Sequence, residues 1–328
     1  MRQVPPAFGL QPPATGMIAT VTLNPSLDEW MQLPALRIGA LNRATGFARY
    51  PGGKGINVSR VIRELGGKTL AFALAGGEDG QILRHLMNRL AIPHEFVTVG
   101  ASTRNNYQIR TTAPRALTEI NTAGPRVSPV VLRALERRLF QHAPAPQYVV
   151  LSGSLPPGVS PRIYQRWILR LRRLNIPSVL DASGPALQHG LRAHPWLIKP
   201  NREEAQELLE RRLTGRHSLV RAVRDLLRRG AVTAILSVGR DGALMASHAL
   251  DGVWLAQSPM ITVNSSVGAG DSLVGGFLVG WARRRSLLEA LRLGVACGTA
   301  TVMTPGTELC HRTDVRRILP RVTIHRVG

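Results

Sequence analysis

Short apolar runs alternate with longer segments of helical periodicity along most of the chain. The apolar runs are predicted to be strands, at Ile18–Leu23, Thr69–Ala75, Tyr148–Ser152, Ser178–Asp181, Leu197–Lys199 and Ala234–Val238. The periodic segments are predicted to be helices, near Ile56–Leu65, Gln81–Leu90, Pro161–Leu174, Glu203–Glu210, Ser218–Arg229 and Ala269–Arg284. This alternation predicts an α/β fold in which helices cover both faces of a mostly parallel sheet. Ligands of such folds bind at the carboxyl ends of the strands.

Two segments depart from this alternation. Leu33–Arg49 and Ser102–Asn121 alternate polar and apolar residues without helix signals, as half-buried antiparallel strands do. We expect them to form a small sheet over the site, a lid spanning about residues 28–50 and 100–122. One face of such a sheet can also pair two copies of the chain. No internal repeat is visible, and residues 17–328 are expected to form a single domain.

The charge of the chain is strongly basic, at +22 from 42 basic and 20 acidic residues. The arginines are spread over predicted helix faces, as in Arg133, Arg137, Arg138, Arg166, Arg170, Arg173, Arg221, Arg224 and Arg228. There is no low-complexity basic arm, no aromatic-interleaved RNA motif and no zinc-finger spacing. Solvated helix faces that help to attract anionic substrates therefore account for the charge better than nucleic-acid binding.

Cysteine content and hydropathy favour a cytoplasmic protein without a membrane span. Two cysteines, Cys297 and Cys310, argue against a disulfide scaffold and fit a reducing compartment. No apolar run approaches the roughly 20 residues that a spanning helix needs. Residues 1–16, MRQVPPAFGLQPPATG, are proline-rich and lack a continuous apolar segment, so they do not form a secretory signal. We expect a disordered tail, or an upstream mis-start if translation begins at Met17.

The stretch NSSVGAGDSLVGG, residues 264–276, carries the strongest chemical signal. Glycines precede a helical pattern here, so backbone amides at Gly268, Ala269 and Gly270 can converge on an anion at a helix N-terminus. Asp271 falls in the first helical turn, where it can accept a proton from a hydroxyl that attacks a phosphoryl group. A capping aspartate behind a glycine turn explains the same letters, and local sequence alone leaves both interpretations open.

The stretch LIKPNREE, residues 197–204, is a strand end followed by a helix start. Asn201 and Glu204 have the spacing of a capping box, which is a complete structural explanation. The functional alternative is that Lys199 meets nucleotide phosphates while Asn201 and Glu204 hold a hydrated Mg²⁺, an ion that takes few protein ligands.

Three further stretches provide candidate binding residues near strand ends. In SVGRDGA, residues 237–243, a strand is followed by a glycine-flanked turn, which is common in α/β proteins. In SGSLPPG, residues 152–158, two hydroxyls, including Ser154, can face a phosphate. In TLNPSLD, residues 22–28, Asp28 follows the first strand, where a carboxylate can bind sugar hydroxyls.

The stretch YPGGKGINVSR, residues 50–60, contains one of only three lysines in the chain. Gly52 and Gly53 let backbone approach a ligand closely, and Asn57 would face the same side one helical turn later. Because nearly all basic residues of the chain are arginines, Lys54 indicates a position suited to a compact ammonium. Arg104, in the second lid segment, can add a second cation for a substrate phosphate.

Together these stretches resemble the PfkB family of ribokinase-like carbohydrate kinases, in its sugar-phosphate branch. PGGKGINVSR resembles the N-terminal signature of that family, and NSSVGAGDSLVGGF the C-terminal one. TLNPSLD, STRNN, SGSLPPG, LDASG, IKPNREE and SVGRDGA occur in the order expected of phosphofructokinases and tagatose-6-phosphate kinases. The match runs from Met17 to about Leu319, and the proline-rich start is extra to it.

The resemblance implies a ribokinase-like α/β/α domain with a β-sheet lid, a dimer joined through the lid, and Mg-ATP as phosphoryl donor. It implies Asp271 as the catalytic base and an anion site at Gly268, Ala269 and Gly270. It places the sugar and its existing phosphate at Asp28, Gly52, Gly53, Lys54, Asn57, Arg104 and Ser154. It places the nucleotide at Lys199, Asn201, Ser237, Gly239, Gly242 and Val267, with Mg²⁺ held by Asn201 and Glu204 through water.

The acceptor sugar is less specifically marked. Lys54, GALNR at residues 39–43 and TEINTAGP at residues 118–125 resemble 1-phosphofructokinases. DASGPAL at residues 181–187 and GTELC at residues 306–310 resemble the 6-phosphofructokinase type. Because acceptor contacts lie mainly in the N-terminal half, fructose 1-phosphate is the leading acceptor. Fructose 6-phosphate and tagatose 6-phosphate remain open, as do an unphosphorylated-sugar kinase and a nucleic-acid-binding protein on a kinase scaffold.

Overall fold

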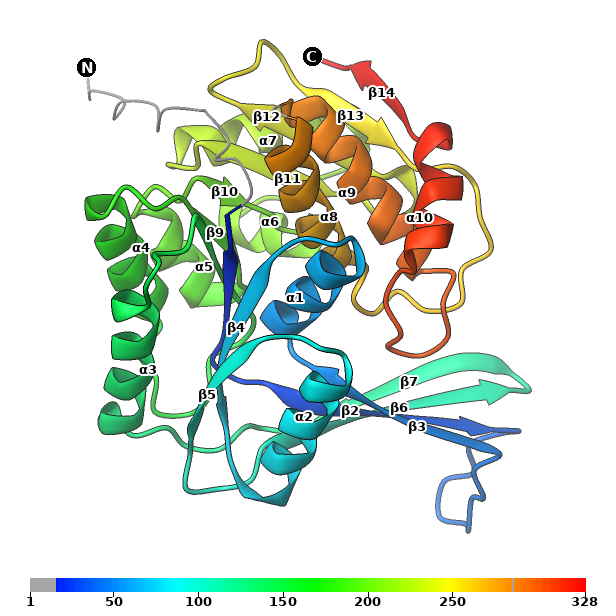
Figure 1. Ribbon diagram of the computed structural model, residues 1–328. Coiled ribbons are helices and arrows are strands. Elements are labelled where there is room, and N and C mark those ends of the chain that lie inside the picture. Colours follow the sequence, from blue (N-terminus) through cyan, green and yellow to red (C-terminus); the bar gives the residue numbers. More distant parts are fainter. Residues whose placement is uncertain (1–15, 285) are drawn as a thin grey trace.

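A large sheet runs through the centre of the molecule and is covered by helices on both faces (Figure 1). The computed structural model describes residues 16–284 and 286–328. The expected disordered tail therefore lies outside the described residues, apart from Gly16. The α/β class predicted from the apolar periodicity is confirmed.

The large sheet is mostly parallel. Within the described residues its strands lie side by side in the order β14 (Thr323–Arg326), β13 (Trp254–Gln257), β12 (Ala243–Ser247), β11 (Thr233–Ser237), β10 (Leu197–Ile198), β9 (Ser178–Asp181), β8 (Tyr148–Ser152), β1 (Ile18–Thr22), β4 (Thr69–Ala75) and β5 (His94–Thr98). Pairing is parallel from β11 through to β5 and antiparallel from β11 to β14. The predicted strands are confirmed to within one residue at each end.

Alternating side chains of the strands lie in two hydrophobic layers, one on each face of the sheet. The face of the sheet that includes Leu151 packs against helices whose buried side chains include Trp167. These helices are α3 (Pro129–Gln141), α4 (Ile163–Arg173), α5 (Gly184–Leu191), α6 (Arg202–Leu209) and α7 (Gly215–Arg228). The opposite face, which includes Val150, packs against helices whose buried side chains include Phe277. These helices include α1 (Lys54–Glu64), α8 (Ala269–Arg284), α9 (Leu287–Thr301) and α10 (Arg312–Ile318). A smaller cluster on that face holds α2 (Gly77–Arg89) against β4 and β5. Burying a side chain such as Phe277 stabilises the fold by roughly 1.5–3 kcal/mol.

A separate small sheet extends to one side, beneath α1 in Figure 1. Among the described residues its order is β3 (Gly46–Gly52), β2 (Ser26–Leu33), β6 (Arg104–Thr112) and β7 (Arg115–Asn121). The prediction of one extended segment over Leu33–Arg49 was wrong, because residues 34–45 form a loop between β2 and β3. The side chain of Asn42 closes this loop by accepting from the amide of Arg37 and donating to its carbonyl oxygen.

Two helix starts define where the functional groups gather. Helix α1 begins at Lys54, directly after β3 ends at Gly52, and α8 begins at Ala269 after a long loop. The two helices pack against each other on one face of the large sheet. Their N-terminal ends therefore meet at the carboxyl ends of the strands, where the small sheet also begins. No helix in the described part of the chain is long and apolar enough to cross a bilayer.

Candidate active site

Asp271 and Asn57 come from the two signature stretches and meet between α8 and α1. Both side chains are buried, and Asn57 Nδ2 donates to Asp271 Oδ2 at 2.8 Å. Burial, and next the nearby carboxylate of Asp181, raise the pKa of Asp271 to about 6, although Lys54 and the Asn57 hydrogen bond oppose the rise. A carboxylate with a pKa near 6 is still ionised at neutral pH and binds a proton more readily than an ordinary aspartate. It is suited to accept a proton.

The glycine turn before α8 lies between Asn57 and Lys199. A Cβ on Gly268, which has a φ of +76°, would come within 2.5 Å of Leu309 Cδ2. A Cβ on Gly270 would lie 3.0 Å from Lys199 Nζ, so glycine lets the ammonium approach the helix start. The Ala269 amide makes a long bond of 3.4 Å to the Ser266 carbonyl oxygen, so this predicted anion-site donor is already weakly engaged.

Asp181, at the carboxyl end of β9, binds both lysines of the site. Its Oδ1 lies 3.1 Å from Lys54 Nζ and 3.5 Å from Lys199 Nζ. Burial alone would raise the pKa of Asp181, but the two ammonium groups outweigh it and hold that pKa below its ordinary value. Lys54 Nζ also lies 3.6 Å from Glu204 Oε1. Burial alone would lower the pKa of Lys54, but the surrounding carboxylates raise it above the ordinary value.

Asp181 is a site residue that the sequence analysis did not single out. Its side chain is fully buried and its Oδ2 has no hydrogen-bond partner among the described residues. The available signal was its position, since it ends a predicted strand inside the LDASG motif. The ion pairs to Lys54 and Lys199 join segments far apart in sequence, so local patterns could not reveal them.

Asp28 lies on the small sheet, on the other side of the base. It accepts hydrogen bonds from Ser26 Oγ at 2.8 Å and Asn106 Nδ2 at 3.0 Å, and burial raises its pKa. A Cβ on Gly52 would lie 2.3 Å from Asp28 Oδ1, so only glycine fits opposite this carboxylate. Gly53, with a φ of +109°, turns the chain into α1 with no room for a side chain against Thr22.

Arg104 and Ser154 are brought together through Asn24, which the sequence analysis quoted in TLNPSLD but did not assign. Arg104 Nε donates to the Asn24 carbonyl oxygen at 3.3 Å, and Asn24 Nδ2 donates to Ser154 Oγ at 3.1 Å. Arg104 Nη1 also donates to Asn106 Oδ1 at 3.2 Å, which places this arginine beside Asp28. Lys54 shares none of these partners. The two cations expected at one sugar phosphate therefore lie in different hydrogen-bond groups.

Asn201 and Glu204 form the capping box that their spacing predicts. Asn201 Oδ1 accepts from the Glu204 amide at 2.7 Å, and Glu204 Oε2 accepts from the Asn201 amide at 2.9 Å. The Asn201 side-chain oxygen is thus used by the helix. Glu204 Oε1 is not used by the capping box and lies 3.6 Å from Lys54 Nζ.

The other predicted nucleotide residues lie along the adjacent strand ends. Ser237 ends β11 and pairs with Asn201 in a parallel bridge. Gly239 begins a 3₁₀ turn with a φ of +65° and open space around it, whereas a Cβ on Gly242 would lie 2.0 Å from the Ala256 carbonyl oxygen. Gly242 therefore has a packing role in the turn. Val267 is half-buried, and its amide donates to Ser265 Oγ at 3.3 Å.

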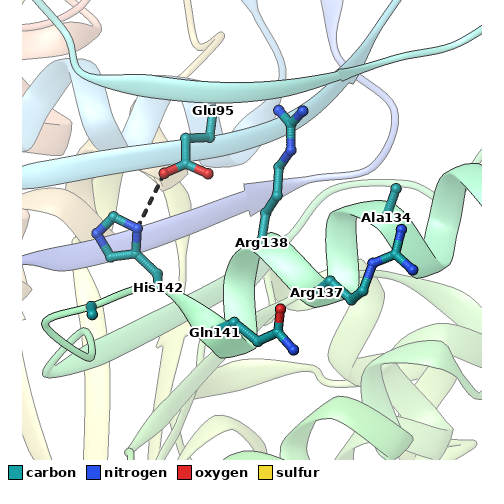
Figure 2. Close-up of a pocket in the computed structure, with 7 residues that line it drawn as sticks. Glu95, Ala134, Arg137, Arg138, Gln141 and His142 are labelled. Atoms are coloured by element: carbon teal, nitrogen blue, oxygen red, sulfur yellow. Dashed lines mark hydrogen bonds and ion pairs between the residues drawn. The ribbon is translucent and has the colours of Figure 1, made fainter.

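A surface pocket elsewhere on the molecule is separate from this cluster. Figure 2 shows it lined by Glu95 of β5, by Arg137 and Arg138 of the C-terminal part of α3, and by His142 directly after that helix. Because α3 leads into the start of β8, the pocket lies at the amino-terminal edge of the sheet, opposite Ser152 and Asp181. The His142–Glu95 pair, at 3.1 Å, closes part of it. It contains no predicted site residue.

Comparisons with known proteins identify relatives along nearly the whole chain. Residues 21–314 match the pfkB family of carbohydrate kinases. The chain is 35% identical to 1-phosphofructokinase of Bacillus subtilis (strain 168) over 311 residues, which cover 95% of this chain and 100% of that protein. It is 36% identical to ATP-dependent 6-phosphofructokinase isozyme 2 of Mycobacterium tuberculosis (strain CDC 1551 / Oshkosh) over 306 residues, covering 92% and 88%.

A solved structure also matches closely. Phosphofructokinase-2 from Escherichia coli in complex with substrates and products superposes with a TM-score of 0.88 and 33% identity, covering 93% of this chain and 99% of that one. The shared fold has the large, mostly parallel sheet and the separate small sheet. The chain therefore belongs to the pfkB family of carbohydrate kinases, enzymes that transfer a phosphoryl group to a sugar hydroxyl.

Proposed function

We propose that the protein is an ATP-dependent phosphofructokinase that converts fructose 1-phosphate to fructose 1,6-bisphosphate. The observation that carries the proposal is the position of Asp271, which is buried, hydrogen-bonded to Asn57 and flanked by Lys54 and Lys199 at the carboxyl ends of the strands. Phosphoryl transfer to a hydroxyl needs a base beside a cluster of positive groups. The phosphofructokinases among the relatives support the choice of sugar.

In this proposal Asp271 accepts the proton of the attacking sugar hydroxyl. The hydroxyl oxygen bonds to the γ-phosphorus as the bond between that phosphorus and the leaving oxygen of ADP breaks. The amides at the start of α8 stabilise the negative charge on the transferring group, because a helix N-terminus favours an anion. Lys54 and Lys199, held by Asp181, add two ammonium groups beside the same helix start.

The acceptor sugar is assigned to the side of the site formed by the small sheet. Asp28 offers a carboxylate oriented by Ser26 and Asn106 for the sugar hydroxyls. Arg104 is assigned to the phosphate that the acceptor already carries, with Ser154 beside it through Asn24. An arginine suits this task because its planar fork can bind two phosphate oxygens at once.

The nucleotide is assigned to the opposite side, along Lys199, Asn201 and the turn that starts at Gly239. The donor set suits a hydrated magnesium ion rather than a directly caged one, since the described residues contain no group of three His, Cys, Asp or Glu side chains around one point. Glu204 Oε1 and the unpaired Asp181 Oδ2 are the oxygens available to waters of such an ion. When bound, Mg²⁺ would neutralise charge on the nucleotide phosphates.

Fructose 6-phosphate is the second candidate acceptor. The DASGPAL stretch, which contains Asp181, and GTELC resemble the 6-phosphofructokinase type. The 6-phosphofructokinase relative is also as similar to this chain as the 1-phosphofructokinase is, at 36% and 35% identity. Both acceptors yield fructose 1,6-bisphosphate, so the product is the same in either case.

We also propose that two copies pair through the outer face of the small sheet. Strand register places Asp28 and Asn106 on one face, toward the site. The opposite face carries apolar side chains that the register puts side by side, namely Met31, Phe47, Tyr107, Ile109 and Ile120. Phe47 and Ile120 are 57% and 49% exposed, which favours a covering partner.

Steady-state measurements across acceptors test the proposed function. ADP release is followed with ATP, Mg²⁺ and fructose 1-phosphate, fructose 6-phosphate, tagatose 6-phosphate, fructose or ribose. We expect the highest kcat/KM with fructose 1-phosphate. A higher value with fructose 6-phosphate would move the assignment to the second candidate, and turnover of unphosphorylated sugars alone would overturn it.

A further inference from the structure

Arg60 is a charged side chain at the centre of the site to which the mechanism above gives no task. It lies on α1, one helical turn after Asn57, and the residue is half-buried. Arg60 Nη1 donates to Asn57 Oδ1 at 3.0 Å, and Asn57 Nδ2 in turn donates to Asp271 Oδ2 at 2.8 Å. We infer that Arg60 is a positioning residue, which fixes the orientation of the Asn57 amide and through it holds the base Asp271.

The inference rests on the chemistry of the two hydrogen bonds. An asparagine side chain has an accepting oxygen and a donating nitrogen of nearly equal size, and either end can face a neighbour. A guanidinium only donates hydrogen bonds, so it can pair only with the oxygen of the Asn57 amide. The nitrogen end must then face Asp271. With the amide turned over, two oxygens would oppose each other and Asp271 would lose its donor.

Arg60 is itself held by elements on both sides of the site. Nη1 donates to the Pro51 carbonyl oxygen at 3.1 Å, at the end of β3, and Nη2 reaches the Thr307 carbonyl oxygen at 3.4 Å. The guanidinium also stands 5.9 Å from the centre of the Tyr50 ring. A movement of β3 or of the loop around Thr307 would therefore disturb Arg60 first and the base next.

Other charged groups also act on the two ends of this chain of contacts. Arg60 is faced by Asp28 and Tyr50 of the small sheet and by Glu308 of the C-terminal loop, besides Asp271. Asp271 is faced by Asp181 of β9, by Lys54 of α1 and by Lys199 after β10. Among the described contacts, none of these groups touches Asn57 Oδ1 in place of Arg60, so Arg60 is the group that holds the oxygen end of the amide.

The effect on the base has a definite sign. The bond from Asn57 favours the ionised form of Asp271 and lowers its pKa against the effect of burial. Without Arg60, Asp271 is the remaining partner that orients the amide, so the hydrogen bond from Asn57 is held less firmly and its support is weakened. The Arg60→Met protein should therefore have an Asp271 pKa above that of the wild-type protein.

The experiment compares Arg60→Met and Arg60→Lys with Arg63→Met, which removes an exposed arginine from the same helix. The pKa of Asp271 is read by ¹³C NMR titration of its carboxyl carbon, assigned with Asp271→Asn. Turnover is measured from pH 5 to 9. This inference depends on the proposed role of Asp271 as base, but the NMR titration does not depend on turnover. If the wild-type protein showed no kinase activity, the proposed function would be refuted. The NMR titration would still show whether Arg60 positions Asp271.

In Arg60→Met we expect the Asp271 pKa and the acid limb of kcat to move upward by about 0.5 to 1 pH unit, with kcat reduced about tenfold. Arg60→Lys should lie between this variant and the wild type, and Arg63→Met should match the wild type. In an Asn57→Ala background, Arg60→Met should move the titration clearly less, because only the direct charge interaction between Arg60 and Asp271 is then lost. Urea unfolding identifies any variant that has lost its structure. If Arg60→Met is unfolded, the comparison with the wild type is made with Arg60→Lys. An unchanged titration in folded Arg60→Met, or equal shifts with and without Asn57, would overturn the inference.

Discussion

Asn57 Nδ2 lies 2.8 Å from Asp271 Oδ2, in a hydrogen bond that joins two stretches 214 positions apart in the sequence. The bond ties the helix that follows the small sheet to the helix that presents the glycine turn. It places the proposed base between the sugar side, at Asp28, and the lysines held by Asp181.

The pH dependence of turnover should report the ionisation of Asp271. Its pKa is raised to about 6, chiefly by burial, and only the ionised form accepts a proton. We expect kcat to be level above pH 7 and to fall about tenfold per pH unit well below pH 6. Initial rates between pH 4.5 and 8 measure the limb. A limb centred near pH 4 would show that the base is a carboxylate with an ordinary pKa.

The contribution of Asp271 to stability should depend on pH in the opposite sense to its contribution to activity. A raised folded-state pKa means that stabilisation is present below the ordinary value of 3.8 and is lost as pH rises through about 6. Asparagine avoids the cost of burying the ionised carboxylate. We expect the Asp271→Asn variant to exceed the wild type in free energy of unfolding by about 1–3 kcal/mol at pH 8.

Urea titrations at pH 5 and pH 8 provide the check on this stability difference. The advantage of Asp271→Asn should shrink toward pH 5, because the wild-type carboxyl is then mostly protonated in the folded state. An advantage that grows on acidification would contradict the sign of the shift.

Lys54 should act on the transferring phosphoryl group rather than on the sugar phosphate. It contacts Asp181 and Glu204, on the side of Lys199, and shares no partner with Arg104. Lys54→Met should lower kcat by about 10²-fold and raise the KM for ATP, with little change in the KM for the sugar phosphate. Lys68→Met, at an exposed lysine, is the matched control. A selective rise in the KM for the sugar phosphate would instead support the expectation from the sequence that Lys54 binds the phosphate of the sugar.

The oligomeric state should depend on the outer face of the small sheet. Phe47→Glu places a charge among the apolar side chains of that face and should shift sedimentation toward the monomer. Leu169→Glu, at a residue 41% exposed on α4, changes the same property elsewhere and should leave the assembly unchanged. A Phe47→Glu protein that sediments like the wild type would place the contact on another surface.

The fold was predictable where burial leaves a simple pattern. The strands of the parallel region are buried on both faces, so they appear as continuous apolar runs such as Tyr148–Ser152. The loop at residues 34–45 was not predicted, because its polar and apolar residues alternate as they do in a strand. Pro34 and the hydrogen bonds of Asn42 interrupt strand pairing there. Helices α3, α5, α9 and α10, strand β5 and the antiparallel strands β12 to β14 were also not predicted.

The site was predictable to the extent that its residues lie in recognisable motifs. The capping box of Asn201 and Glu204 was anticipated from spacing alone, whereas Asp271 and Asn57 became specific candidates only through the resemblance of their stretches to a family. The partner of Lys54 was not, because an ion pair to Asp181 spans 127 positions and leaves no local pattern. Arg60 was visible in the signature, but its contact with Asn57 acquires meaning only once Asp271 is known to lie on the other side.

Paired ADP-release assays of wild type and Asp271→Asn, with ATP, Mg²⁺ and fructose 1-phosphate, test the central claim most directly. Direct ATP binding to both proteins is measured by calorimetry alongside. We predict that the wild type turns over and that kcat of the variant falls at least about 10³-fold while ATP affinity changes little, because only the base is lost. Near-normal turnover in the variant would contradict the account.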